Sequence, residues 1–169
     1  MLSANENQVL KTVAADLGTT PAALSALIQF ESGFNPKAKN PFSSARGLIQ
    51  FTDTTARALG FNDSLDLVTR FSTIEKQLLL VHKYLKKYAP FRDDQALFMS
   101  VFYPAARDWP ITREFPDYVQ AVNPGIKTVL DYVNKVYGKK KAIEAAGVGA
   151  GALALIAAAL FFIFRKGKT

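Results

Sequence analysis

One carboxyl group stands where it could act as a general acid. In the segment that begins at Pro21, Leu24, Leu27, Ile28 and Glu31 follow one another at the spacing of a single helical face. A carboxyl group at the end of a core-facing stripe is poorly hydrated, and poor hydration disfavours its ionised form. This predicts a raised pKa for Glu31 and proton donation near neutral pH. The alternative is a helix-terminal Glu that reaches solvent.

Two linked motifs begin at this carboxyl group and continue after it in the sequence. Glu31 begins the run Glu-Ser-Gly-Phe-Asn-Pro-Lys-Ala (31–38), and a polar loop leads to Ser-Ala-Arg-Gly-Leu-Ile-Gln (44–50) and then Thr-Asp-Thr-Thr-Ala (52–56). This order resembles the soluble lytic transglycosylase (SLT) family, which has a catalytic Glu followed by Ser, a Phe-x-Pro-x-Ala turn, a Gly-Leu-Met-Gln-like segment and a Thr-Ala helix start. The resemblance is dense over residues 20–60 and thinner towards the C-terminal side.

The resemblance implies a reaction. Members of the family cleave the β-1,4 bond between N-acetylmuramic acid and N-acetylglucosamine in peptidoglycan. Protonated Glu31 would donate to the leaving oxygen, and would then take the proton of the muramyl 6-hydroxyl, which closes a 1,6-anhydro ring. One carboxyl group serves both steps, so no second acid, cofactor or metal is expected. The nearest acidic residues in the sequence, Asp16 and Asp53, are interpreted as helix-terminal or surface groups.

Four further positions carry over from the family as substrate contacts. Ser32 matches a Ser that helps to position the sugar, with a helix C-cap hydroxyl as the alternative, and Gln50 matches a Gln of the cleft. Tyr103 matches a Tyr whose hydroxyl approaches the catalytic Glu, although Phe-Tyr-Pro-Ala-Ala at 102–106 replaces the family's Ala-Tyr-Asn-Ala-Gly. The replaced Asn and Gly put contacts there in doubt. Tyr132 is assigned to a late Tyr of the cleft, with a core aromatic as the alternative.

Short helices must position these residues, because several stretches follow a period of 3.6 and none sustains a period of two. The segments between them, 32–50 and 103–113, are rich in Gly, Pro, Asn and Ser and are predicted to be loops. The fold predicted for residues 1–138 is therefore all-α, and the resemblance makes it lysozyme-like. Start and stop signals predict helices over 5–17, 20–31, 52–60, 67–88 and 93–102, and one opened by Asn123-Pro124.

The charge is unevenly distributed along the chain. The net charge of +7 would suit a nucleic-acid binder, but residues 1–138 hold 15 basic and 13 acidic side chains, and residues 139–169 hold six and one. Nucleic acid is therefore not expected as a partner. The absence of cysteine excludes disulfides and thiolate chemistry, and a single His, His82, is interpreted as a surface or partly buried residue of the long helix.

The basic C-terminal part has its own explanation. Residues 145–164 form an uncharged run of eight Ala, three Gly and nine Val, Leu, Ile or Phe. As a helix this run would span roughly 30 Å, the thickness of a bilayer's hydrocarbon core. We therefore expect a basic juxtamembrane linker at 139–144, a transmembrane helix at 145–164 that contacts the lipid bilayer, and a basic tail at 165–169. Gly147 and Gly151 have the spacing of a helix–helix contact.

No secretion signal is visible at the N-terminus, whereas the expected substrate lies outside the cytoplasmic membrane. Delivery in the membrane of a bacteriophage virion, for local wall degradation during entry or exit, would resolve this mismatch. The alternative location is a bacterial envelope with the catalytic domain facing the periplasm. The alternative activities are a goose-type lysozyme-like hydrolase of the same bond and a non-catalytic peptidoglycan-binding membrane protein.

Overall fold

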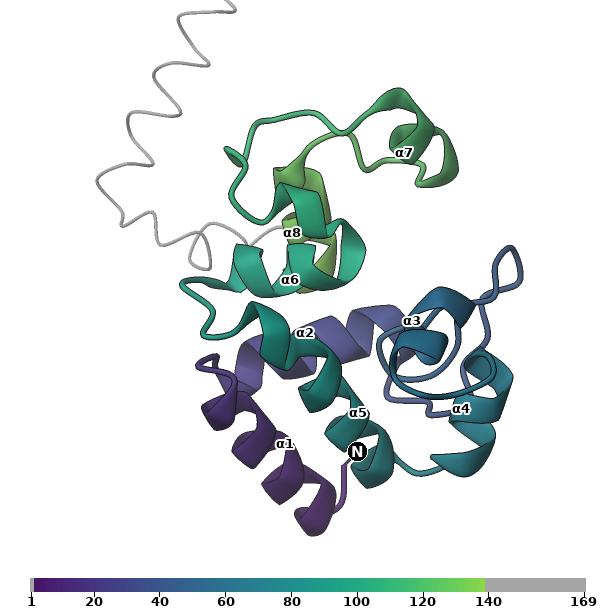
Figure 1. Cartoon of the computed structure of the whole chain (residues 1–169). Helices are drawn as coiled ribbons and strands as arrows, with labels where there is room; N and C mark the ends of the chain where they lie inside the picture. The colour runs from purple at the N-terminus through teal and green to yellow at the C-terminus, as the bar shows by residue number, and fades with distance from the viewer. Residues whose placement is uncertain (1, 139–169) are drawn as a thin grey trace, which may run out of the picture. The chain divides into compact units, whose positions relative to one another are not determined.

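The computed structural model describes residues 2–138, and within them every regular element is a helix (Figure 1). The chain divides into two compact units, one up to Pro110 and the other from Ile111. The all-α prediction is therefore confirmed for the described residues. The predicted linker at 139–144, the transmembrane helix at 145–164 and the tail at 165–169 lie outside them. No helix within residues 2–138 is long and apolar enough to cross a membrane.

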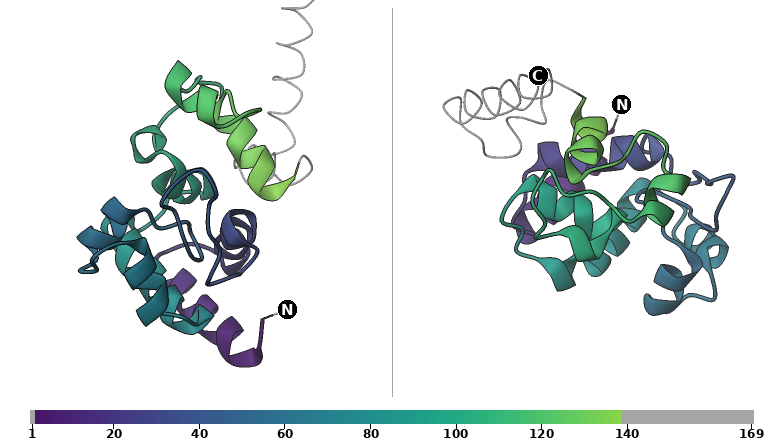
Figure 2. Two further views of the ribbon diagram at one scale, coloured as in Figure 1. Left: turned by 90° about the vertical axis from the view of Figure 1, so that its right-hand side faces the viewer. Right: turned by 90° about the horizontal axis from the view of Figure 1, so that it is seen from above.

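The first unit holds most of the helices, and two further views show them joined by irregular segments (Figure 2). Its elements are α1 (Ala4–Asp16), α2 (Pro21–Ser32), α3 (Asp53–Ala58), α4 (Ser64–Arg70), α5 (Ile74–Leu85), the 3-10 turn η1 (Lys86–Tyr88), α6 (Asp94–Phe102) and the 3-10 turn η2 (Pro104–Ala106). Helix α1 packs against α2 and α5, α3 packs against α4, and α6 packs against α2.

Side-chain caps set most of the helix starts. Thr20 accepts a hydrogen bond from the Ala23 amide directly before Pro21, as the sequence predicts, and Asp93 accepts one from Ala96 at the start of α6. Ser3 and Glu6 form a reciprocal capping box at α1. These local signals explain why the helices predicted over 5–17, 20–31 and 93–102 agree closely with α1, α2 and α6.

The prediction of one long helix over 67–88 is wrong, because the chain breaks at Phe71. Helix α4 begins after Asp63 and ends at Arg70, and α5 begins after Thr73, whose hydroxyl accepts from the Lys76 amide. The apolar spacing continues across the break and conceals it. A second cap inside a periodic segment is the signal for two helices.

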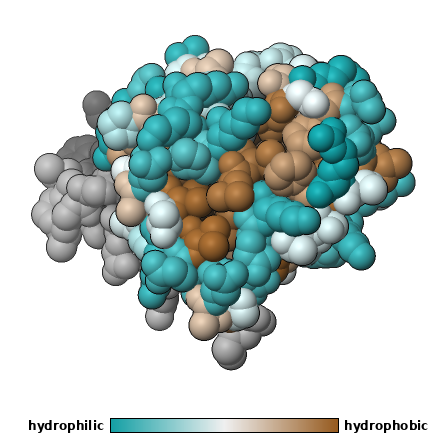
Figure 3. Space-filling view, turned by 60° about the horizontal axis from the view of Figure 1, so that its bottom comes forward, coloured by the Kyte–Doolittle hydropathy of each residue, from teal (hydrophilic) through white to brown (hydrophobic). Residues whose placement is uncertain are grey.

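The core of the first unit is built from the inner faces of these helices. Its fully buried members include Leu17, Leu24, Leu27, Ile28, Leu48, Leu67, Leu78, Leu85 and Phe98. Each such side chain contributes about 1.5–3 kcal/mol relative to an exposed one. Figure 3 shows one face of the molecule, on which hydrophilic side chains surround recessed apolar residues. Because Leu48 is fully buried, the core extends under the loop that contains it.

The second unit contains α7 (Asp117–Val122) and α8 (Val129–Tyr137) among the described residues. The helix predicted to open at Asn123-Pro124 begins instead after Thr128, which forms a capping box with Asp131. The backbone amides of Val129 and Leu130 donate to the carbonyls of Arg113 and Ile111, which ties the start of α8 to the start of the unit. Helix α7 was not predicted.

Candidate active site

Glu31 occupies the last turn of α2, at the end of the predicted apolar face. Leu24, Leu27 and Ile28 are fully buried, whereas Glu31 itself is half-buried. The face is therefore as predicted, and its last member lies at the boundary between the core and solvent. A carboxyl group there can be partly desolvated and still reach a ligand.

The chain turns sharply directly after Glu31 and Ser32. Gly33 has a left-handed backbone (φ 61°), and its amide donates to the carbonyl of Gln29 at 2.9 Å. Phe34 is left-handed as well (φ 62°), which is uncommon for a side chain of this size. The side-chain oxygen of Asn35 then accepts from the Lys37 amide at 2.9 Å. This turn ends the helix one residue after the candidate acid.

A side-chain hydrogen bond joins the two sequence motifs. The Ser32 hydroxyl lies 2.9 Å from the carbonyl oxygen of Leu48 and 3.1 Å from that of Ile28. Both neighbours are acceptors, so the single hydroxyl proton is used within the protein. Ser32 can therefore offer a sugar only the lone pairs of its oxygen, which accept from an amide or a hydroxyl group. The bond to Ile28, one turn earlier in α2, corresponds to the helix-terminal hydroxyl that the sequence offers as the alternative.

The second motif forms a small hairpin. Arg46 and Phe51 exchange two backbone hydrogen bonds, of 3.0 and 2.8 Å, and the Gly47 amide donates to the carbonyl of Ala38 at 2.9 Å. Gln50 at its tip is left-handed (φ 55°), and its side-chain amide donates to the Gly47 carbonyl at 3.0 Å. A non-glycine residue in this region is strained, and such strain persists where the surroundings hold it in place.

The side chain of Gln77, on α5, binds this hairpin through hydrogen bonds. It is fully buried, and its side-chain oxygen accepts from the Leu48 amide at 2.9 Å. Its side-chain nitrogen donates to the carbonyls of Pro36 and Phe71, at 2.7 and 2.8 Å. One amide therefore links the turn after Glu31, the Gly-Leu-Ile-Gln segment and the break between α4 and α5. The sequence analysis missed Gln77, although a polar residue on the apolar face of α5 was the available signal.

Gly47 is required by this contact. A Cβ atom at this position would lie 2.5 Å from the side-chain oxygen of Gln77 and 3.1 Å from a methyl group of Val68, and the backbone is left-handed (φ 76°). Only glycine combines this conformation with this approach. Gly47 therefore shapes the loop through its backbone, whereas the neighbouring Leu48 packs into the core and is fully buried.

The start of α3 is fixed to the same loop. The Asp53 amide donates to the Ser44 hydroxyl at 3.1 Å, and the Asp53 carboxylate accepts from the backbone amide of Ser64 at 3.0 Å. The hydroxyl of Ser64 donates to the Ser44 carbonyl at 2.5 Å. The hydrogen bond from the Ser64 amide lowers the pKa of Asp53 below its ordinary value. Asp53 is therefore an ionised structural group, in agreement with its predicted helix-terminal role.

Tyr103 lies directly after α6, where the chain leaves the helix. Its ring is half-buried and lies 5.6 Å from the ring of Trp109, centroid to centroid. Helix α6 packs against α2, which carries Glu31. Aromatic faces of this kind can stack on sugar rings. The structure thus places Tyr103 in an aromatic pair on the first unit.

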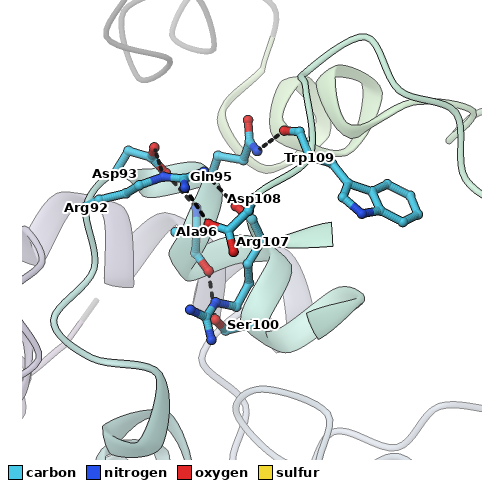
Figure 4. A network of polar contacts seen from close by, with 8 residues as sticks. All are labelled: Arg92, Asp93, Gln95, Ala96, Ser100, Arg107, Asp108 and Trp109. Atoms are coloured by element: carbon cyan, nitrogen blue, oxygen red, sulfur yellow. Dashed lines mark hydrogen bonds and ion pairs between the residues drawn. The ribbon is translucent and has the colours of Figure 1, made fainter. Parts of the chain in front are cut away.

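A polar network fixes the segment that carries this pair (Figure 4). Arg92 donates to the carboxylates of Asp93 and Asp108 and, at 2.8 Å, to the carbonyl of Arg107. The side chain of Gln95 donates to the carbonyl of Trp109 at 2.8 Å, while the indole ring of Trp109 points away from the network. The start of α6 therefore anchors the backbone of 107–109 and leaves the indole to the aromatic pair.

The hydroxyl of Tyr84 joins α5 to α6 behind this segment. It donates to the Ser100 carbonyl at 3.1 Å, and burial raises the pKa of Tyr84. Both α5 contacts, from Gln77 to the hairpin and from Tyr84 to α6, run to elements that carry candidate site residues. Helix α5 is the common support of these elements.

Tyr132 lies on α8 and His82 lies on α5. Tyr132 belongs to the second unit and is only 1% exposed, so its ring is not accessible to a glycan in this structure and its burial supports the core alternative. His82 is half-buried. It contacts the carboxylate of Asp16 at 2.5 Å, and Lys86 contacts the same carboxylate at 2.9 Å. These contacts agree with the interpretation of Asp16 as a helix-terminal or surface group and of His82 as a partly buried residue of the helix.

A comparison with known families adds an independent line of evidence. The model of the transglycosylase SLT domain matches residues 9–100. This range contains Glu31, Ser32, Gln50 and Gln77, and it ends shortly before Tyr103. No solved structure matches the chain. The match covers more than half of the sequence, and the chain belongs to the SLT transglycosylase family.

Proposed function

We propose that this protein is a peptidoglycan lytic transglycosylase that uses Glu31 as its single acid and base. The enzyme cleaves the β-1,4 bond between N-acetylmuramic acid and N-acetylglucosamine and releases a 1,6-anhydromuramyl end. The family indicates activity of this class on peptidoglycan. The observation that carries the proposal for this chain is the hydrogen bond from Ser32 to Leu48, which joins the residue after the candidate acid to the hairpin that contains Gln50.

Glu31 acts in two steps within this proposal. Its protonated carboxyl group donates to the glycosidic oxygen as the bond to the muramyl C1 breaks and positive charge develops on that ring. The resulting carboxylate then takes the proton of the muramyl 6-hydroxyl as that oxygen bonds to C1. The acid is thereby regenerated and no water is consumed. Ser32, Gln50 and Tyr103 contact the substrate around this carboxyl group.

The test is a peptidoglycan digest by the full chain, with product masses, run beside Glu31→Gln. The amide is nearly isosteric with the acid but cannot donate this proton, so activity should fall by roughly a thousandfold or more. Anhydromuramyl ends support the transglycosylase. Reducing ends would identify a hydrolase instead, and cleavage by Glu31→Gln at the wild-type rate would refute the role of Glu31. Binding without cleavage by the wild type would favour the non-catalytic alternative.

We further propose that residues 145–164 anchor the enzyme in a membrane, and that this is the membrane of a bacteriophage virion. The uncharged run and its basic flanks support the anchor, and a wall-degrading enzyme held in a particle membrane would act locally. Alkaline carbonate extraction of membranes from expressing cells tests the anchor. Detection in purified, infectious particles tests the location, and detection only in envelopes of uninfected cells would refute it.

A further inference from the structure

A hollow of about 380 Å³ lies beside α4 on the first unit. It is separate from the groups assigned to Glu31 chemistry, but its walls come from the same loop and hairpin. Gln77 holds two of these walls, through its bonds to Pro36 and Leu48. The hollow is lined by Lys37, Arg46, Leu65, Val68, Thr69 and Ser72.

The lining is positively charged. It includes the amine of Lys37 and the guanidinium of Arg46, and no acidic residue belongs to it. The backbone of Arg46 is held on both sides by its two hydrogen bonds with Phe51. The backbone of Arg46 is therefore fixed, and its charge also acts on the carboxylate of Asp53, whereas Lys37 is exposed and can adapt. Two cations around one hollow attract an anion.

The guanidinium of Arg46 has an unused donor. Its Nε atom is buried, and no hydrogen-bond partner for it exists among the residues that the structure describes. A buried donor on a charged group costs more than about 1–3 kcal/mol when it stays unsatisfied. Arg46 belongs to the lining of the hollow, and a carboxylate suits a guanidinium group because it can accept two parallel hydrogen bonds.

The other lining groups describe what accompanies the anion. The Thr69 hydroxyl donates to the Leu65 carbonyl at 2.7 Å, so its oxygen can only accept a hydrogen bond, and Ser72 supplies a further hydroxyl group. Leu65 is 54% exposed and Val68 is 8% exposed, which adds an apolar wall. A carboxylate beside a small apolar side chain and an amide N–H matches these groups. A short peptide with a free carboxylate has all three.

We propose that this hollow binds the C-terminal carboxylate of the peptide stems attached to the glycan. The inference rests on the proposed function, because peptidoglycan links a sugar chain to peptides that carry carboxylates. Arg46 directly precedes the segment 47–50, so a stem held by Arg46 is held by the hairpin that also presents Gln50. The site distinguishes peptide-bearing glycan from bare glycan.

Binding is tested with the full chain and a labelled stem tetrapeptide, as the free acid and as the amide at its C-terminal carboxylate. Lys37→Met and Arg46→Met should each weaken binding of the acid by about tenfold, the loss expected for one charge-assisted hydrogen bond. Lys39→Met is the matched control, because this exposed lysine lies two residues from Lys37 but is not part of the lining. Equal affinity of all variants for the acid, or of the wild type for acid and amide, overturns the proposal.

A phosphate-bearing wall polymer is the competing occupant. The polymer would be the occupant if teichoic acid displaced the tetrapeptide at a phosphate concentration below the dissociation constant of the tetrapeptide. That result would overturn the proposal. Inorganic phosphate measures the affinity for the anion alone. Displacement of the tetrapeptide by it only at far higher concentration supports a site that reads the peptide as well.

Digestion kinetics separate this site from the catalytic one. Lys37→Met should raise KM for peptidoglycan with intact stems and leave KM for glycan stripped of its stems by an amidase unchanged. Equal losses on both substrates overturn the proposal, and Lys37 is exposed, so its replacement preserves the fold. If the wild type cleaves neither substrate, the proposed function fails. The tetrapeptide measurement still decides whether the hollow binds a carboxylate.

Discussion

The Ser32 hydroxyl lies 2.9 Å from the carbonyl oxygen of Leu48, sixteen residues further along the chain. Ser32 is the neighbour of the candidate acid, and Leu48 lies two residues before Gln50, a candidate substrate contact. This hydrogen bond therefore fixes the end of α2 against the hairpin that faces the substrate in the proposed mechanism.

Replacing Ser32 with Ala should reduce turnover more than it reduces stability. The variant loses one hydrogen bond, which lowers the free energy of unfolding by about 1 kcal/mol. The looser hairpin should lower kcat by roughly tenfold, because reacting groups must be held within a fraction of an ångström. Kinetics on peptidoglycan and urea unfolding check the two effects.

Ser25→Ala is the matched control for this variant, since Ser25 lies on the same helix seven residues earlier and makes no part of the proposed catalytic machinery. Wild-type turnover in Ser32→Ala would show that the hydroxyl is only a helix-terminal group.

Gln77→Met should be strongly destabilising. Methionine keeps the volume of the side chain but leaves the Leu48 amide and the carbonyls of Pro36 and Phe71 without their partner. Each unpaired buried group costs about 1–3 kcal/mol, partly recovered where water can enter. The measurement is chemical denaturation of the variant beside Lys76→Met, an exposed neighbour on α5. Equal stability of these two variants would contradict the supporting role of Gln77.

Much of the fold followed from short-range signals, and Gln77 marks where they end. Thr20-Pro21 and Asp93 are caps that act within three residues, so they can be recognised without the rest of the molecule. The break at Phe71 was missed because the apolar spacing runs through it and the cap at Thr73 was not recognised. The bonds from Gln77 to Leu48 and Pro36 span 29 and 41 residues, and partners so far apart are not encoded in local spacing.

The candidate site shows the same division. The position of Glu31 on its helix followed from periodicity, and its role followed from the family resemblance. A polar residue on an apolar face was the reason for selecting Glu31, and the same reasoning applied to α5 would have selected Gln77 beside Leu78 and Val81. Tyr132 was assigned to the site as a match to a late Tyr of the family's cleft, and its burial could be known only from packing.

Acid should weaken the attachment of α1 to α5 through Asp16. Lys86, and after it His82, lowers the pKa of the Asp16 carboxyl group below its ordinary value of 3.8. A carboxyl group with a lowered pKa in the folded state stabilises the fold above its unfolded pKa. That contribution is lost as the pH falls through the folded value. Thermal unfolding should therefore show Asp16→Asn below the wild type at neutral pH, with the difference vanishing below pH 3.8.

The control for this titration is Asp117→Asn, which changes an exposed Asp in the second unit. A gap between Asp16→Asn and the wild type that stays constant from neutral pH to strong acid would show that the ion pairs with His82 and Lys86 contribute nothing.

The left-handed backbone of Gln50 allows its two roles to be separated. Gln50→Gly removes the side chain and relieves a conformation that costs an L-residue roughly 1–2 kcal/mol, whereas Gln50→Ala removes the side chain and keeps the strain. If the amide contacts the substrate, both variants should raise KM alike, while Gln50→Gly unfolds at a higher temperature than Gln50→Ala. Gln50→Asn keeps an amide that tolerates this backbone, and should recover part of the affinity. If KM instead follows the unfolding temperature across the three variants, Gln50 only shapes the hairpin through its bond to Gly47.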